Sequence, residues 1–537
     1  MSLPTALQPD RRDALWLDGR VLAVAAACAC LAALWQFPSP YDGNGDTAWL
    51  LIVAGRMLDG ARLYVDVIET NPPMSILLYV PGVWLARLFG GAPELWMYGQ
   101  VSAMAALSIW AVAGLSRQAG LESSSSRVLF GLLVGFVLLI MPTRCFGQRE
   151  HVALIALLPY LMLTAARWQG AFRPSLWLAL AVGAGAGLGL SIKPHFAVIL
   201  GLTHAAMLIR DARHGGAWLD RLVAHMRAGR LVPPEGLVAA ALLVAYVAMV
   251  FWCYPAFFAE IYPRLALAYL PHKLTLVEFL GTPATLLVGL ACAFILFARF
   301  GRLSALAVGL LAASLGGFAA YAIQFKGWPY HQIPAFGFLA IAFGALVLGN
   351  AEEPGRDNAV RQRVASLGMI ALFGVWVPGL LAAHETPRAL EAEIRARVSQ
   401  PTILIASSNL GINFPLVRRV GGTWAGRSAS LWMSEGASAL LASETRPDRR
   451  AQLVQLFELD RRLFVEDALR VRPDVIALSA FDAPTDLLPW ARTDPRMAEL
   501  LESYRQTAHV DGLRVLVRTD RLAAADQSTL AAKLAGP

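Results

Sequence analysis

The stretch at residues 303–323 reads LSALAVGLLAASLGGFAAYAI and contains no charged side chain. A helix needs about 20 apolar residues to cross the roughly 30 Å hydrocarbon core of a bilayer, and this stretch is long enough. The whole chain has the same character: 57% of its 537 residues are hydrophobic and 16% are charged, whereas soluble domains are about one-quarter charged. The sequence therefore predicts a polytopic α-helical membrane protein.

Other apolar runs of similar length, bounded by Arg, Lys, Pro or Gly, bring the number of predicted spans to eleven. Besides 303–323 these runs are residues 21–37, 95–115, 128–141, 152–166, 176–190, 196–209, 237–253, 284–297, 333–348 and 364–383.

Arginines precede the first run, but no small-residue cleavage site follows it, so we expect a retained first helix rather than a signal peptide. Four of the five cysteines lie inside apolar runs and Cys145 lies near the end of one, which indicates neither a disulfide framework nor a zinc site. We therefore expect no cofactor. The net charge of +8 comes largely from arginines beside the spans, a pattern typical of cytoplasmic loops rather than of nucleic-acid binding.

The most basic loop, which carries five arginines between residues 210 and 230, is placed in the cytoplasm. Alternation then places residues 41–73, 144–151, 191–195, 254–281 and 324–331 on the outer side. Residues 74–89 are apolar enough to cross, but crossing would turn the basic N-terminus outward. We expect this segment to lie along the outer interface or to re-enter, helped by Pro81.

After residue 384 the composition becomes that of a soluble domain. β-type runs at residues 402–407, 475–480 and 513–519 alternate with helical stretches such as 449–471, which predicts an α/β fold. The division expected is a transmembrane module at residues 1–384 and an extracytoplasmic domain at 385–537. Residues 254–281 are interpreted equally well as an interfacial segment that closes over a lipid chain or as a connector.

Ionisable and aromatic side chains gather at the predicted outer side, where charges at span ends indicate a polar cavity. Acidic groups in the first outer loop would face basic groups from three others, which suits a phosphate leaving group opposite a carboxylate that accepts a proton. The candidate residues are Asp42, Asp46, Asp66, Glu69, Arg149, His151, Lys193, His195, Lys326, Tyr330 and His331, with Arg144 and Glu150 nearby.

Four motifs in this order resemble a known superfamily: GDTAWLLIVAGRMLDG at 45–60, YVDVIETNPP at 64–73, KPHF at 193–196 and KGWPYH at 326–331. They resemble the GT-C membrane glycosyltransferases that use polyprenyl-phosphate sugars. Within this superfamily, the chain resembles the protein O-mannosyltransferases and the aminoarabinose and galacturonic acid transferases that act on lipid A. The resemblance covers roughly residues 20 to 350.

This resemblance implies inverting transfer of a sugar from a polyprenyl-phosphate donor to a hydroxyl acceptor at the outer face of a bacterial inner membrane. Asp46 would be the general base, and the other candidate residues would bind substrate. The partners would be the donor, the acceptor and the lipid bilayer, without nucleic acid. Such relatives often have two adjacent acids in the first loop, whereas Thr47 follows Asp46 here. Roles for Asp42, Asp66 and Glu69, and for a divalent metal, therefore stay open.

Each assignment has an alternative. Asp46 suits a helix N-cap, and Asp66 and Glu69 suit solvated loop charges. Residues 144–151 suit an ordinary loop with Arg–Glu pairing, and Lys193 suits a side chain that snorkels to the interface. A transporter or lipid flippase would also need charges along its path, but transporters often contain repeated halves, which this sequence lacks. A polysaccharide polymerase or ligase would share the lipid donor, and a receptor would explain the outer domain alone.

Overall fold

The structure is a computed structural model, and it describes residues 39–170, 172–212, 218–271, 273–283, 285, 288–289, 303–349, 363–374, 388–479 and 487–522. Contacts divide the chain into two compact units. The helical unit contains the described residues of Tyr98–Tyr246 and Thr275–Leu381. The mixed unit contains those of Phe37–Met97, Val247–Leu274 and Ala382–Pro537.

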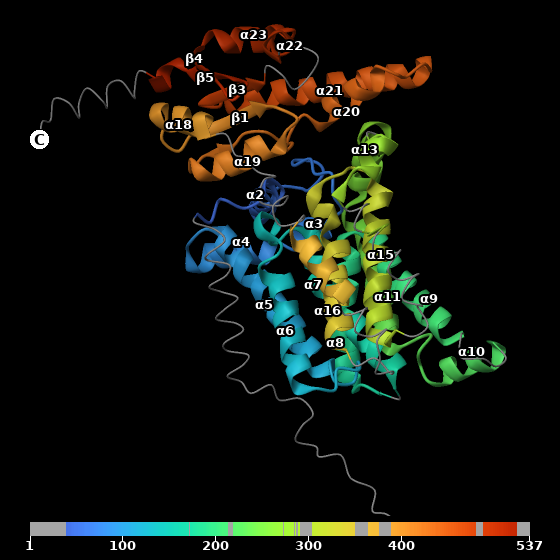
Figure 1. Ribbon diagram of the computed structural model, residues 1–537. Helices are drawn as coiled ribbons and strands as arrows, with labels where there is room; N and C mark the ends of the chain where they lie inside the picture. Colours follow the sequence, from blue (N-terminus) through green and yellow to red (C-terminus); the bar gives the residue numbers. More distant parts are fainter. Residues whose placement is uncertain are drawn as a thin grey trace, which may run out of the picture. The chain divides into compact units, whose positions relative to one another are not determined.

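The helical unit contains several long apolar helices (Figure 1). Its elements are α5 (Pro93–Leu115), which begins in the mixed unit, α6 (Ser124–Leu139), η1 (Thr143–Cys145), α7 (Arg149–Gln169), α8 (Leu176–Ile192), η2 (Pro194–Phe196), α9 (Ala197–Ala212), α10 (Trp218–Arg227), α11 (Pro234–Cys253), which ends in the mixed unit, α13 (Leu276–Leu280), α15 (Ala305–Gln324), η6 (Pro329–Gln332) and α16 (Ile333–Leu348).

Helices occupy the predicted runs that lie in the described residues, and their apolar character indicates membrane association. Among the described residues, five helices are long and apolar enough to cross a bilayer: Pro93–Leu115, Arg149–Gln169, Pro234–Cys253, Ala305–Gln324 and Pro329–Leu348. Helices α6 and α8 are apolar but shorter. The predicted run 21–37, most of 284–297 and the end of 364–383 fall outside the described residues. Eleven spans therefore stay a prediction.

Helix α15 forms the centre of the helical unit because two adjacent glycines let neighbouring helices approach closely. A Cβ atom placed on Gly316 would lie 2.5 Å from Cα of Ile199 on α9, and one on Gly317 would lie 2.6 Å from the backbone nitrogen of Ala335 on α16. Ser314 adds a hydrogen bond of 2.8 Å to the carbonyl of Ala335. The GG pair within the apolar run therefore sets the packing of three helices.

The mixed unit combines three separate parts of the chain. Its helices are α2 (Gly45–Leu58), α3 (Met74–Leu77), α4 (Val80–Phe89), η3 (Phe257–Ile261), α12 (Tyr262–Arg264), η4 (Leu265–Tyr269), α18 (Arg388–Arg397), α19 (Leu410–Arg419), α20 (Trp432–Leu441), α21 (Pro447–Val471), α22 (Leu487–Arg492) and α23 (Pro495–Glu502). Its strands are β1 (Thr402–Ala406), β2 (Thr423–Trp424), β3 (Val475–Ser479), β4 (Tyr504–Val510) and β5 (Leu513–Arg518).

The strands form one sheet in the order β2-β1-β3-β5-β4. The first three strands are parallel, with Ile403 opposite Val475, and β5 runs antiparallel to β3 and β4. Strands β1 and β3 are apolar and almost wholly buried, as expected for central strands covered on both faces. The predicted strands at 402–407, 475–480 and 513–519 and the helix at 449–471 are confirmed. Strands β2 and β4 were not predicted, since one is two residues long and the other is polar.

The first predicted outer loop belongs to the mixed unit rather than forming a free connection. Helix α2 packs against α19, and the backbone of Ile68 pairs with Ser428 in an isolated parallel bridge. The motif at residues 45–60 forms a helix at Gly45–Leu58, and most residues of this helix are buried. Residues 74–89 form two short helices, and Pro81 lies in the first turn of α4, where a proline is tolerated.

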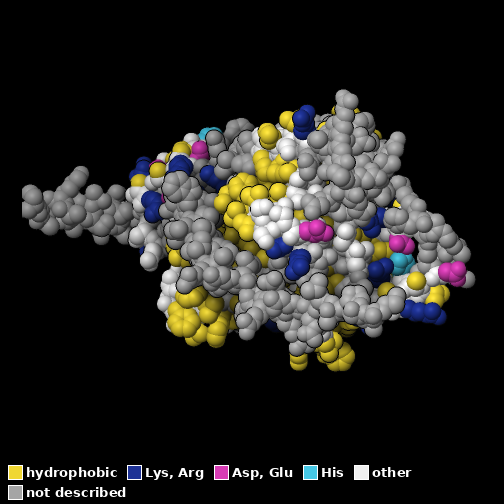
Figure 2. All heavy atoms as spheres, turned by 60° about the horizontal axis from the view of Figure 1, so that its bottom comes forward, with side chains coloured by type: hydrophobic (Ala, Val, Ile, Leu, Met, Phe, Trp, Pro, Cys, Tyr) yellow, Lys and Arg dark blue, Asp and Glu magenta, His cyan; other side chains and the backbone are white. Residues whose placement is uncertain are grey.

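The surface carries apolar side chains that a water-soluble protein would bury. Leu132, Trp177 and Val244 are exposed on helices α6, α8 and α11. Figure 2 shows hydrophobic side chains at the surface of one face, with Lys and Arg side chains beside them. Exposed apolar side chains on membrane helices are expected to contact lipid.

Replacing Gly317 by Ala is expected to lower the free energy of unfolding by about 1 to 3 kcal/mol, because the added methyl group meets the α16 backbone. The control is Gly309→Ala on the same helix, where the obstacle is the flexible Met207 side chain. Thermal unfolding in detergent measures the difference. Equal melting temperatures for the two variants would contradict the proposed role of the GG pair.

The predicted topology is testable at exposed positions. In a cysteine-free background, Cys introduced at Lys273 or Ser443 is expected to react with an impermeant maleimide added outside. Cys at Ser123 or Ala228 is expected to react only after permeabilisation, because these positions lie on the predicted cytoplasmic side. All four residues are exposed in the structure. The reverse pattern would overturn the orientation.

Candidate active site

Lys193 lies at the break between α8 and α9. Pro194 has no backbone N–H and disfavours helical geometry in the residue before it. Lys193 is accordingly extended, with φ −144° and ψ 108°, and the chain makes the short turn η2 before α9 begins. The lysine side chain is 9% exposed. Pro194 therefore ends α8 just before Lys193, whose side chain is buried in the helical unit.

The ammonium group of Lys193 joins four segments of the helical unit. Its Nζ donates to Oε1 of Glu150 at 2.6 Å and to Oε1 of Gln324 at 3.1 Å, and it lies 3.3 Å from Nε2 of His331. The same Glu150 oxygen is 3.4 Å from His331 Nε2. Glu150 is in the first turn of α7, Gln324 ends α15 and His331 lies in η6. We call Glu150, Lys193, Gln324 and His331 the Lys193 cluster.

Glu150 is the carboxylate of this cluster and is completely buried. The N-terminus of α7 favours a negative charge there. Burying two charges costs solvation free energy, which their mutual attraction must offset. Here Nζ of Lys193 lies 2.6 Å from Oε1 of Glu150. The sequence interpretation that Lys193 snorkels to the interface is therefore wrong, because its charge is paired inside the protein.

Other basic side chains act on the Lys193 cluster. Arg149 is buried beside Glu150, and Arg149, His195 and Lys326 are close enough to act electrostatically on His331. Burial and the nearby Lys193 charge lower the pKa of His195 to about 3, so this imidazole is neutral near pH 7. Lys193, Arg149 and Lys326 thus all bring positive charge near His331, and Lys193 is paired with Glu150. Cationic side chains of this kind can bind an anion.

Three polar atoms of this region are buried without a hydrogen-bond partner among the described residues. They are Oε2 of Glu150, Nε2 of His195 and Nδ1 of His331. Buried polar atoms in folded proteins are usually satisfied by protein or water, and exceptions concentrate at functional sites. Their gathering around one lysine indicates a place where water or a polar ligand binds.

His151 has a different environment from its neighbours. Its Nδ1 accepts the backbone N–H of Gly147 at 3.0 Å, and its Nε2 is 2.7 Å from the carbonyl of Leu138. This network assigns the proton to Nε2, and both ring nitrogens then bond to the backbone. His151 therefore binds the backbone of the connection between α6 and α7.

Tyr330 packs in an aromatic group at the start of η6. Its ring is 5.7 Å from the ring of Trp328 and 4.6 Å from that of His331. Pro329 begins the turn and sets its backbone geometry. This aromatic group holds His331 toward Lys193.

Asp46 lies in the first turn of α2, and the N-cap of that helix is Asn44. The Asn44 side chain accepts the backbone N–H of Asp46 at 2.8 Å, and Thr47 donates to the Asn44 carbonyl at 2.7 Å. The alternative that Asp46 is the N-cap is therefore wrong by two residues. The capping role is filled without its carboxylate.

The other three acids of the first loop have distinct partners in the mixed unit. Asp42 forms an ion pair with Arg419 of α19. Asp66 bonds to Arg62 at 3.0 Å, which lowers the pKa of this exposed carboxyl to about 2 and agrees with a solvated loop charge. Glu69 is 3% exposed and accepts hydrogen bonds from Trp49 and Asn71, so it is not a solvated charge.

The four acids belong to the mixed unit and the Lys193 cluster to the helical unit. The convergence of the two sets, expected from the sequence, stays a prediction. Two members of the cluster were missing from the predicted site: Glu150 was named only as a neighbour, and Gln324 carries no charge to mark it. Glu150 had a usable signal, because an acid at the start of an apolar span requires a partner.

Among the described residues, no group of three or more His, Cys, Asp or Glu side chains is placed to hold a metal ion. In the comparisons with known proteins, neither a family model nor a curated protein matched the chain.

Replacing Lys193 by Met is expected to lower the free energy of unfolding by about 3 kcal/mol, because Glu150 would keep a buried charge without its partner. Combining Lys193→Met with Glu150→Gln should recover part of this loss. Chemical unfolding in detergent measures both values. Additive losses in the double variant would show that the two side chains do not depend on each other.

Proposed function

We propose that this protein is an inverting glycosyltransferase that moves a sugar from a polyprenyl-phosphate donor to a hydroxyl acceptor at the outer membrane face. The observation that carries the proposal is the buried Lys193 cluster at the ends of apolar helices, with the cationic Arg149 and Lys326 acting on its His331. A lipid-linked phosphate enters from the bilayer and requires positive charge at that depth. The motif resemblance supports the same substrate class, and the proposed location is a bacterial inner membrane.

Lys193, Arg149 and Lys326 would bind the donor phosphate as it leaves. In the transfer, the acceptor oxygen forms a bond to the anomeric carbon while the bond from that carbon to the phosphate oxygen breaks. The leaving phosphate retains the electron pair, and fixed cations stabilise the developing charge. Glu150 would hold Lys193 in place and limit the net charge of the cluster.

Asp46 would act as the general base that takes the acceptor proton. It lies in the first turn of α2, and Asn44 rather than Asp46 supplies the cap of that helix. That Asp46 and the Lys193 cluster meet in one site is part of the proposal, and it comes from their common predicted side of the membrane.

A transporter is the second candidate, because a buried Lys–Glu pair is a common feature of ion pathways. The positions of the pair count against it. Glu150 lies in the first turn of α7 and Lys193 directly follows α8, whereas transporter sites lie near the bilayer midplane. A cluster at helix ends is better suited to a reaction at the interface.

Replacing Asp46 by Asn is expected to reduce sugar transfer by about 10² to 10⁴-fold, because the amide cannot accept the proton. Donor binding should be unchanged, since the phosphate is assigned to the other residues. Reconstituted protein assayed with a panel of polyprenyl-phosphate sugars measures both.

The matched control is Asp59→Asn, which changes an exposed carboxylate at the other end of the same helix. It should retain the parental rate. Full turnover in the Asp46 variant would remove Asp46 as the base, and loss of transfer in both variants would point to damage of α2 instead.

A further inference from the structure

We propose that the loop at residues 424–428 of the C-terminal domain positions α2, and that Arg56 is the positioning residue that connects them. The inference that this affects catalysis rests on the proposed function, because α2 carries Asp46. The connection between α2 and this loop is observed directly as contacts within the mixed unit. We call residues 424–428 the docking loop.

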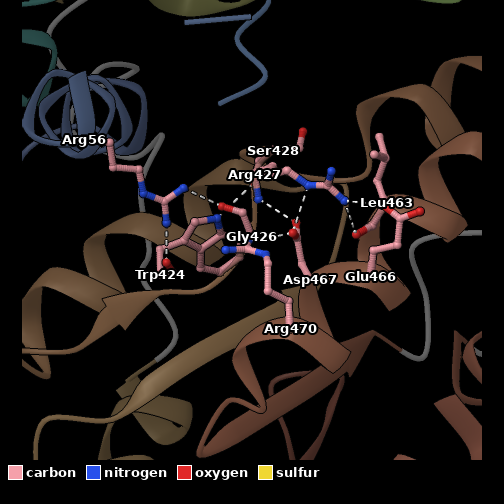
Figure 3. Close-up of polar contacts among 9 residues, drawn as sticks. All are labelled: Arg56, Trp424, Gly426, Arg427, Ser428, Leu463, Glu466, Asp467 and Arg470. Atoms are coloured by element: carbon pink, nitrogen blue, oxygen red, sulfur yellow. Dashed lines mark hydrogen bonds and ion pairs between the residues drawn. The ribbon is translucent and has the colours of Figure 1, made fainter. Parts of the chain in front are cut away.

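Arg56, in the last turn of α2, binds two backbone carbonyls of the docking loop (Figure 3). Its Nη1 donates to the carbonyl of Gly426 at 2.7 Å, and its Nη2 donates to that of Trp424. A guanidinium is planar and presents its donors in a rigid fork, so two acceptors define its orientation as well as its position. The C-terminal end of α2 is thereby attached to a segment 368 to 370 residues later in the chain.

A second part of the first loop bonds to the same segment. The backbone N–H of Ile68 donates to the carbonyl of Arg427 at 2.8 Å. The carbonyls of residues 424, 426 and 427 therefore all accept hydrogen bonds from residues 56 and 68. Three carbonyls of the docking loop are thus satisfied by residues of the first loop.

Asp467 on α21 holds the docking loop in the shape that Arg56 requires. Its carboxylate accepts the backbone N–H of Arg427 at 2.7 Å and Nε of the same residue at 2.9 Å. The Arg427 guanidinium also contacts Glu466 at 2.7 Å. Asp467 is 4% exposed, and Figure 3 shows its side chain directed toward Arg427. The connection thus runs from α21 through the loop to α2.

The N-terminal end of α2 is fixed by packing against α19. A Cβ atom placed on Gly45 would lie 3.2 Å from the carbonyl oxygen of Leu410 and 3.3 Å from Cα of Gly411. Further along the helix, the rings of Trp49 and Phe414 are 4.9 Å apart. Contacts at both ends of α2 leave its first turn, and hence Asp46, little freedom to move.

A general base must be held within roughly 0.5 Å of its productive position. If the C-terminal domain supplies that restraint, a change in the docking loop should alter turnover without touching substrate. This gives the domain a specific task in catalysis: it sets the position of the base.

The test uses the full chain in lipid nanodiscs and the variants Arg56→Ala, Arg56→Lys and Asp467→Asn. The control is Arg397→Ala, an exposed arginine of the same unit whose partner is Glu393. Hydrogen–deuterium exchange is measured over residues 45–58, and kcat and KM are measured for sugar transfer.

Arg56→Ala and Asp467→Asn are expected to speed exchange in α2 and to lower kcat by about 10²-fold, as for a misplaced catalytic group. KM for the donor should not change. Arg56→Lys should recover part of kcat, because one ammonium cannot reproduce the fork. A variant with both changes should lose little more than either alone, since both act through the same loop.

Unchanged exchange in Arg56→Ala would overturn the docking of α2, whatever the activity. Faster exchange with unchanged kcat would overturn its catalytic consequence. If the parental protein transfers no sugar while the variants still show the expected exchange, the proposed function fails and the docking stands.

Discussion

The helical unit depends on the contact between Lys193 and Glu150. An ammonium group buried among apolar helices is stable only beside a carboxylate, and this pair joins the end of α8 to the start of α7. Gln324 and His331 add the end of α15 and the turn before α16. Polar contacts at one end of the helices thus complement the close glycine packing along α15, and together they arrange the residues to which we assign phosphate binding.

The mixed unit shows that a loop and a distant domain can fold as one body. Residues 37–97 supply α2, and the C-terminal domain supplies the helix and the loop that receive it. The acids of the first loop differ in environment: Asp42 is paired with Arg419, Asp66 forms an exposed pair with Arg62, and Glu69 is buried. Asp46 differs from them because it lies in the first turn of a helix that Asn44 caps.

The division of charge between the two units bears on function. In the helical unit Lys193 is paired with the buried carboxylate of Glu150, and the first loop of the mixed unit carries the proposed base. In the proposed transfer, fixed cations would stabilise the leaving anion and a carboxylate would accept the proton. A structural ion pair alone would not explain the three unsatisfied polar atoms around Lys193.

The sequence by itself determined the helical character, most helix positions and the three apolar strands. The spacing and length of apolar runs, which indicate these elements, can be read from residues that are neighbours along the chain. It also identified Lys193 and His331, since charges at span ends are costly and therefore conspicuous. Only the tertiary structure decided that Asn44 caps α2, that Glu150 and Gln324 bind Lys193, and that Arg56 reaches the docking loop. Those contacts join segments far apart in sequence or depend on the residue at which a helix begins. Side-chain hydrogen bonds of this kind produce no periodic pattern in the sequence.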